Sequence, residues 1–202
     1  MNHGKCQTSE GRPRRIAHLL KLAGMLLATV LLSGCDGSLH DAALRGDVTQ
    51  ARTLLDRNPA AINDRNELGK TPLHQSLTGG NNETILLLIE RGADIAAKDD
   101  TGLTPLHVAA WWSITERAGL LIDSGADLNG QDKFGDTPLH VAAMHGRAKM
   151  CKVLIERGAL MDAVNRDGRT PLDLAILHGQ TESVRVIEYY RRNAVNTAFA
   201  GH

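Results

Sequence analysis

Histidines recur at a fixed spacing in this sequence, and histidine is a common metal ligand. His74, His107 and His140 are 33 residues apart, and His145 and His178 form a second series with the same step. If each step is one layer of stacked helices, equivalent side chains lie about 8–10 Å apart. Two ligands of one zinc ion lie within about 4 Å of each other. We therefore predict that these histidines bind no metal ion.

Other residue types that could do chemistry are not arranged for catalysis. The sequence contains no glycine-rich phosphate loop, no GxSxG and no HExxH. Asp99, Asp100 and Asp132 fall at the bases and tips of predicted hairpins, where aspartate is first a turn residue. We expect a protein without enzymatic activity and without a cofactor.

The elements that position these residues repeat every 33 residues. TPLH begins at Thr71, Thr104 and Thr137, and TPLD begins at Thr170. Threonine caps a helix, and proline suits its first position, where no N–H is needed. A pair of small alanines follows, then a second segment with larger apolar residues and a closing glycine. A degenerate unit from Ser38 precedes these four, and its extra residue falls in RNPAAIN.

These motifs resemble the ankyrin repeat. The resemblance implies an all-α solenoid of five helix–turn–helix units with β-hairpin or turn tips, whose histidines make structural hydrogen bonds. Each unit leaves an apolar face bare, so the array needs more polar units at its ends. The units are 38–66 (N-terminal cap), 67–99, 100–132, 133–165 and 166–192 (C-terminal cap), followed by a tail at 193–202.

The first segment has the pattern of an export signal. Three arginines (Arg12, Arg14 and Arg15) precede the apolar run 22–32, which is too short to span a bilayer comfortably. LSGC, ending at Cys35, resembles the lipobox of bacterial lipoproteins. The resemblance implies that residues 1–34 are removed and that Cys35 receives the lipid anchor. Residues 35–37 then form the lipidated cysteine and a linker of about 7–10 Å.

Charge and cysteine usage fit an exported lipoprotein. Residues 1–34 carry a net charge of +4 and the whole chain is neutral, so the remainder is mildly acidic. An acidic chain argues against nucleic acid as a partner. Only Cys151 stays free after processing, and we expect it to be a small buried hydrophobe. Asp36 resembles an inner-membrane retention signal, so we expect a periplasm-facing envelope protein at the inner membrane, with the outer membrane as the alternative.

Exposed aromatic residues predict a binding surface. In ankyrin proteins the turn tips and the two residues after the paired alanines line a concave groove that binds proteins. Large apolar side chains at such positions are typical of interface hot spots. The predicted surface comprises Leu103, Trp111, Trp112, Phe134, Met144, His145, Arg166, Arg169 and His178.

The two tryptophans allow two interpretations. Ala118 stands where other repeats have Ile85, Cys151 and Val184, so one tryptophan could fold inward and fill the missing volume. Adjacent helical residues point about 100° apart, and both are therefore not expected to do so. We expect Trp112 to face the partner.

An anchored binding module suggests two functions. The first is an immunity protein that captures a membrane-active toxin, because bacterial ankyrin lipoproteins resemble the partners encoded beside phospholipase effectors. The alternative is a scaffold for a periplasmic or membrane enzyme such as a stress-response catalase. Both rest on analogy, since a fold does not determine function. We expect a monomer in either case.

Overall fold

The structure is a computed structural model that describes residues 37–199, and the described residues from Ser38 onward form one compact unit. The predicted signal segment 1–34 and Cys35 lie outside the described residues. The described part contains ten α-helices, one 3₁₀ helix and no strand, as an all-α solenoid requires. The helices are α2 (Leu39–Arg45), α3 (Val48–Arg57), η1 (Pro59–Asn63), α4 (Pro72–Thr78), α5 (Asn82–Glu90), α6 (Pro105–Trp112), α7 (Thr115–Asp123), α8 (Pro138–Met144), α9 (Ala148–Glu156), α10 (Pro171–Leu177) and α11 (Thr181–Phe199).

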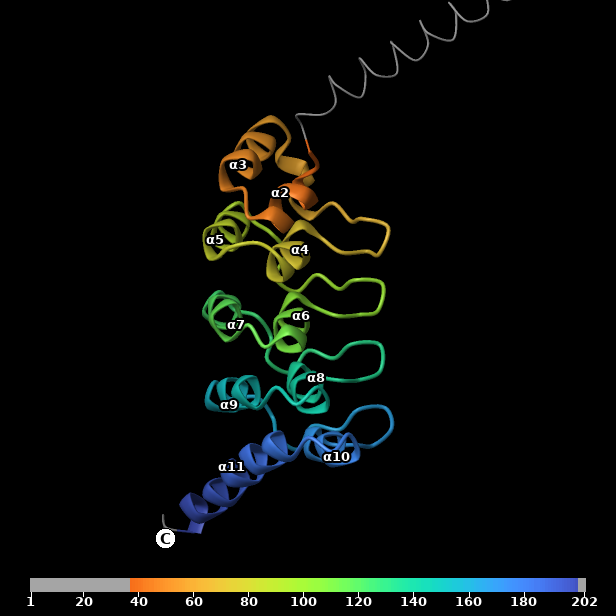
Figure 1. The fold of residues 1–202 in the computed structure, drawn as a ribbon, viewed down its shortest axis with the longest axis vertical. Coiled ribbons are helices and arrows are strands. Elements are labelled where there is room, and N and C mark those ends of the chain that lie inside the picture. The colour runs from red at the N-terminus through yellow and green to blue at the C-terminus, as the bar shows by residue number, and fades with distance from the viewer. Residues whose placement is uncertain (1–36, 200–202) are drawn as a thin grey trace, which may run out of the picture. The chain divides into compact units, whose positions relative to one another are not determined.

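The helices form two columns within this unit (Figure 1). The even-numbered helices α2 to α10 make one column, which we call the inner helices. The odd-numbered helices α3 to α11 make the other, the outer helices. The long turns that precede α4, α6, α8 and α10 project from the inner column, and we call their ends the tips. One inner helix, one outer helix and the preceding tip make one repeat.

The inner helices begin as the TPLH motif predicts. In each of the three TPLH repeats, the threonine is the N-cap and proline opens the helix. The backbone N–H of the threonine donates to histidine Nδ1, at 3.2 Å for Thr71–His74, 3.2 Å for Thr104–His107 and 3.1 Å for Thr137–His140. In α10 the carboxylate of Asp173 takes this role. Local capping therefore starts every one of these helices.

The same histidines join each repeat to the next. Because Nδ1 accepts an N–H, the proton is on Nε2, which donates to a tip carbonyl of the following repeat. These distances are 3.0 Å for His74–Leu103, 2.9 Å for His107–Asp136 and 3.0 Å for His140–Arg169. Burial lowers the pKa of all three rings, which favours the neutral form. Both ring nitrogens are thus occupied by structural bonds.

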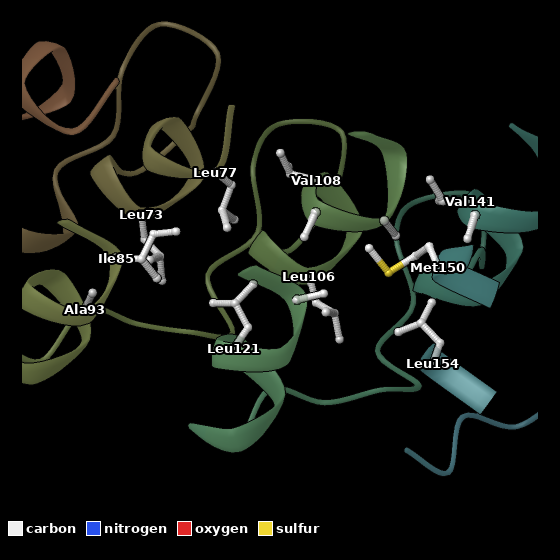
Figure 2. Packing of buried hydrophobic residues seen from close by; sticks show 14 of the residues in the cluster. Leu73, Leu77, Ile85, Ala93, Leu106, Val108, Leu121, Val141, Met150 and Leu154 are labelled. Atoms are coloured by element: carbon white, nitrogen blue, oxygen red, sulfur yellow. The ribbon is translucent and has the colours of Figure 1, made fainter. Parts of the chain in front are cut away.

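The core lies between the two columns and is aliphatic. Leu106 and Leu121 of the third repeat, and Met150 and Leu154 of the fourth, are at most 1 % exposed (Figure 2). The paired alanines of α6 and α8 are fully buried, which allows close approach of neighbouring inner helices. Cys151 is buried as predicted, and burial raises the pKa of its thiol to about 12.

The tips are turns closed by backbone hydrogen bonds. The N–H of Asp99 donates to the carbonyl of Leu103 at 2.9 Å, and the equivalent pair in the next repeat, Asp132 and Asp136, is also 2.9 Å apart. Glycines 69, 102, 135 and 168 adopt positive φ at the turns. Neighbouring tips are also joined, for example by Arg166 N–H to Phe134 O at 3.0 Å. The tips therefore form a continuous edge along the stack.

Both end units differ from the regular repeat. In the first unit, the segment RNPAAIN, where we expect one extra residue, contains η1 at Pro59–Asn63. At the other end, α11 continues to Phe199, past residue 192 where we expect the last unit to end. No helix among residues 37–199 is long and apolar enough to cross a membrane.

Candidate functional site

A pocket of about 390 Å³ lies between inner helices α6 and α8 and the tips of the second, third and fourth repeats. Its helix side is formed by Trp111 of α6 and by Val141 and Met144 of α8. Its tip side is formed by Leu68, Lys70, Asp99, Asp100, Thr101, Leu103, Asp132, Phe134 and Asp136. This volume falls within the range of ligand pockets, about 300–1,000 Å³.

A larger hollow of about 820 Å³ lies at the first repeat. It is lined mainly by polar side chains such as Asp64, Arg65, Asn66 and Glu67. Hot spots at interfaces are enriched in aromatic anchors, and no Trp, Tyr or Phe lines this hollow. We therefore take the smaller, aromatic-lined pocket as the candidate site.

Trp111 is positioned by the fourth repeat. Its ring lies 4.0 Å from the ring of His145, centroid to centroid, at an interplanar angle of 42°. Arg147 Nε donates to the Trp111 carbonyl at 2.9 Å. Burial, followed by the charges of Arg147 and His178, lowers the pKa of His145, so the ring beside Trp111 is favoured in its neutral form. The indole is thereby held at the pocket although 40 % of the residue is exposed.

Neither tryptophan fills the core beside Ala118. Trp112 is 56 % exposed and does not belong to the pocket lining. The structure therefore favours Trp111 over Trp112 as the residue that a ligand of the pocket would contact. This choice depends on His145, which comes from a different repeat.

The structure brings only part of the predicted surface together. Leu103, Trp111, Phe134 and Met144 line the pocket, and His145 supports it. The remaining predicted residues lie outside the lining. Arg166 joins the Phe134 tip through its backbone, Arg169 lies 3.9 Å from the Asp167 carboxylate, and exposed His178 follows α10.

Sequence reasoning missed the acidic residues of this pocket. We interpreted Asp99 and Asp132 only as turn residues, and they do have that role, since each carboxylate accepts N–H groups of its own turn. Burial alone would raise the pKa of Asp99, but hydrogen bonds from Thr101 and Leu103 lower it below the ordinary value. Asp136 was likewise only a tip residue. The alignment of the repeats could have indicated them, because Asn66 and Asn165 stand at the positions equivalent to Asp99 and Asp132.

The third repeat also contains an arginine that binds the second. Arg117 Nη1 donates to Leu77 O at 2.9 Å and to Ser76 O at 3.4 Å, and Nη2 donates to Gly80 O. These carbonyls lie at and just beyond the end of α4, whose C-cap Gly79 has φ −126° and forms no left-handed turn. Arg117 therefore satisfies a helix end that lacks the usual cap. Its role is structural, although it stands next to the tryptophan segment.

The family follows from the repeat pattern and this fold. A family model described as ankyrin repeats, in three copies, matches residues 39–132 and 115–196. The chain belongs to the ankyrin-repeat family. Ankyrin repeats are protein–protein interaction modules, and the family generally serves as a non-catalytic binding scaffold. In residues 37–199 of this ankyrin-repeat protein, no three His, Cys, Asp or Glu side chains are grouped to hold a metal ion.

Proposed function

We propose that this ankyrin-repeat protein binds a protein partner through the pocket of its third and fourth repeats, as an immunity protein that captures a membrane-active toxin in the bacterial envelope. The observation that supports binding is the exposure of large apolar side chains around one pocket. Trp111 is 40 % exposed and Phe134 is 66 % exposed. Aromatic residues gathered at a pocket are typical of interface anchors.

The anchor is the second part of the proposal. Cys35 lies outside the described residues, and its lipidation rests on the LSGC motif. Two residues separate it from Ser38, where the repeat unit begins, so the short linker would hold the first repeat close to the membrane surface. A toxin such as a phospholipase effector acts at that surface. Capture there would remove it from its substrate.

Contact-dependent competition tests this function. A strain that lacks the gene is mixed with its toxin-secreting parent and then complemented with the wild type, Trp111→Ala or Cys35→Ser. We expect the wild type to restore survival and both variants to fail. Trp112→Ala is the matched control, because it removes the neighbouring tryptophan outside the pocket, and it should protect. Equal survival of the deletion strain and its parent would reject the immunity role and leave the enzyme-scaffold alternative.

The size of the Trp111 effect follows from hot-spot energetics. Truncation of an anchor residue costs about 2 kcal/mol or more of binding free energy, which is roughly a 30-fold loss of affinity. Purified toxin and each variant can be compared by calorimetry once the toxin is known. A loss below about threefold for Trp111→Ala would show that the pocket does not anchor the partner.

A further inference from the structure

Four tips place an amide or carboxylate at the same position, and all four use it in the same way. Oδ1 of each side chain accepts two N–H groups of its own turn. The distances are 3.0 and 3.0 Å at Asn66, 2.8 and 3.0 Å at Asp99, 2.8 and 2.9 Å at Asp132, and 3.0 and 3.0 Å at Asn165. A neutral amide therefore closes this turn as well as a carboxylate does. The negative charges at 99 and 132 are not needed for the turn.

The tips that carry a carboxylate at this position are the ones at the pocket, and the tips that carry an amide are not. Asp99 and Asp132 line it, whereas Asn66 and Asn165 do not. A third carboxylate, Asp136, lies in the lining at a position where other repeats have Lys70, Leu103 and Arg169. Asp136 is 8 % exposed, and its Oδ1 accepts from Asn165 Nδ2 at 2.8 Å. Three acidic side chains thus line the same pocket, and the turns do not require the charge of Asp99 or Asp132.

These three carboxylates have no partner cation within the described part of the chain. The ion pairs there include none with Asp99, Asp132 or Asp136, whereas Asp100 is paired with Arg65 at 3.0 Å. The neighbouring lysines donate to backbone carbonyls instead of these carboxylates, Lys98 Nζ to Gln131 O at 2.7 Å and Lys133 Nζ to Asp100 O.

Two kinds of neighbouring group do not cancel this charge. His74, His107 and His140 lie near the carboxylates and are favoured in the neutral form by burial. Lys70 is the single cation in the lining and faces four aspartates. The pocket therefore keeps an excess of negative charge.

The other walls of the pocket are apolar and aromatic. Carboxylates beside such walls interact strongly with a cation, because the local dielectric constant is lower than that of water. A cation close to the ring of Trp111 or Phe134 would gain further from cation–π attraction. Lysine and arginine combine an apolar stem with a cationic end, which matches both features.

We propose that the pocket binds an arginine or lysine side chain of the protein partner, with its stem against Trp111, Phe134 and Met144 and its cation facing Asp99, Asp132 and Asp136. This inference rests on the proposed protein binding and names the residue type that the pocket selects. It also assigns Asp99 and Asp132 a second role, in partner recognition, beside their role in the turns.

The test compares two probes that differ chiefly in charge, N-acetyl-arginine amide and N-acetyl-citrulline amide. Full-length protein in detergent carries Trp112→Phe, so that Trp111 fluorescence alone reports binding. At low ionic strength we expect the arginine probe to bind at least about fivefold more tightly than the citrulline probe. High salt should reduce this preference. Equal binding of the two probes by the otherwise unchanged pocket would overturn the proposal without any further variant.

A double variant, Asp99→Asn with Asp132→Asn, tests which groups are responsible. The amides can make the turn hydrogen bonds that Asn66 and Asn165 make, so the fold should persist in circular dichroism. We expect the preference for arginine to fall below about twofold. Asp167→Asn, at a tip outside the pocket, is the control and should leave the preference unchanged. A preference that persists in a folded double variant would also overturn the proposal.

These results separate this inference from the proposed function. Trp111→Ala could abolish protection in competition while the pocket does not discriminate arginine from citrulline. The proposed protein binding would then stand, and the proposal that the pocket binds a cationic side chain would be wrong. If arginine is preferred but Trp111→Ala still protects, the selectivity of the pocket stands and the immunity role through this pocket is wrong.

Discussion

The third and fourth repeats have the same pair of helices and the same capping histidine, yet their aligned positions 111–119 and 144–152 all differ, and five of these differences concern the scaffold or the exposed surface. Ser113 stands where the fourth repeat has Gly146, Arg117 where it has Met150, Ala118 where it has Cys151, and Gly119 where it has Lys152. The fifth difference is Trp111–Trp112 against Met144–His145. At each of the first four positions, the fourth repeat has a residue that fits the repeat scaffold well. The third repeat has there either a residue that fits it less well or, at Arg117, one that bonds to a neighbouring repeat.

The comparison separates residues that build the stack from residues that use it. Ser113 has φ 59°, and no other non-glycine among the described residues has a positive φ. Gly119 lies inside α7, where glycine weakens a helix. Because repeats stabilise their neighbours, one weak repeat can persist between strong ones. The repeat that presents the exposed tryptophans is therefore the one that depends most on its neighbours.

The largest effect is expected from acid, since it acts on the capping histidines of the second, third and fourth repeats together. Burial lowers the pKa of His74, His107 and His140 below the ordinary 6.5 in the folded state. The unfolded chain therefore binds more protons below that value, and the free energy of unfolding falls as the pH drops below 6.5. Urea unfolding at pH 7.5, 6.5 and 5.5 measures this trend. Stability that is constant over this range would contradict neutral, bonded histidines.

Arg117→Met gives the third repeat the residue of the fourth and should nevertheless destabilise the protein. The carbonyls of Ser76, Leu77 and Gly80 lose their charged donor, at a cost of about 1.5–3 kcal/mol. Because methionine keeps an apolar side chain of similar length, the loss of stability measures the contribution of the hydrogen bonds. Denaturant unfolding measures the change, and Arg185→Met on exposed α11 is a control that should cost little. An unchanged or increased stability would show that α4 does not need this cap.

Exchange of the residues at the left-handed position should have opposite effects in the two repeats. Ser113→Gly relieves a conformation that costs a side chain about 1–2 kcal/mol, and the greater freedom of glycine in the unfolded chain offsets about 0.4–1 kcal/mol of that gain. We expect a net stabilisation of up to about 1 kcal/mol. Gly146→Ser should destabilise by at least as much, because Gly146 has φ 68°. Thermal unfolding of both variants decides the point, and equal signs would refute the comparison.

The smallest effect is expected at Gly119. An added Cβ would meet only Arg157 Nη2 at 3.9 Å, so alanine fits without displacement. Gly119→Ala should stabilise the protein by about 0.5–1 kcal/mol through helix propensity. Lys152→Gly in the fourth repeat is the matched reverse change and should cost a similar amount. A loss of stability in Gly119→Ala would mean that glycine is required for packing.

The stack was predictable because its rules are local and repeat. Threonine caps, proline at the first helical position and the 33-residue step placed α4, α6, α8 and α10. The apolar residues around Cys151 on a helical pattern identified it as a core residue. The site was less predictable because it depends on contacts between repeats. Trp111 rather than Trp112 lines the pocket through a ring of the next repeat, His145. Arg117 acts on backbone carbonyls 37–41 residues away, which no side-chain pattern reveals.

The acidic residues of the pocket were predictable from sequence in part. The turn role of Asp99 and Asp132 follows from sequence, since aspartate and asparagine bond to their own backbone. That the two charged positions face one pocket, and that Asp136 joins them, required the geometry of neighbouring tips. A comparison of aligned positions across repeats would have shown where charge replaces amide.

Photo-crosslinking from the pocket tests the central claim, that the third and fourth repeats carry the protein-binding site. A crosslinking amino acid replaces Phe134 at the pocket or, as a control, Leu160 outside the lining, two apolar residues that are 66 % and 58 % exposed. We predict that illumination of intact cells joins one envelope or incoming protein to position 134 and not to position 160. Adducts of equal or greater yield at position 160, or none at position 134 in the presence of the captured toxin, would contradict the claim.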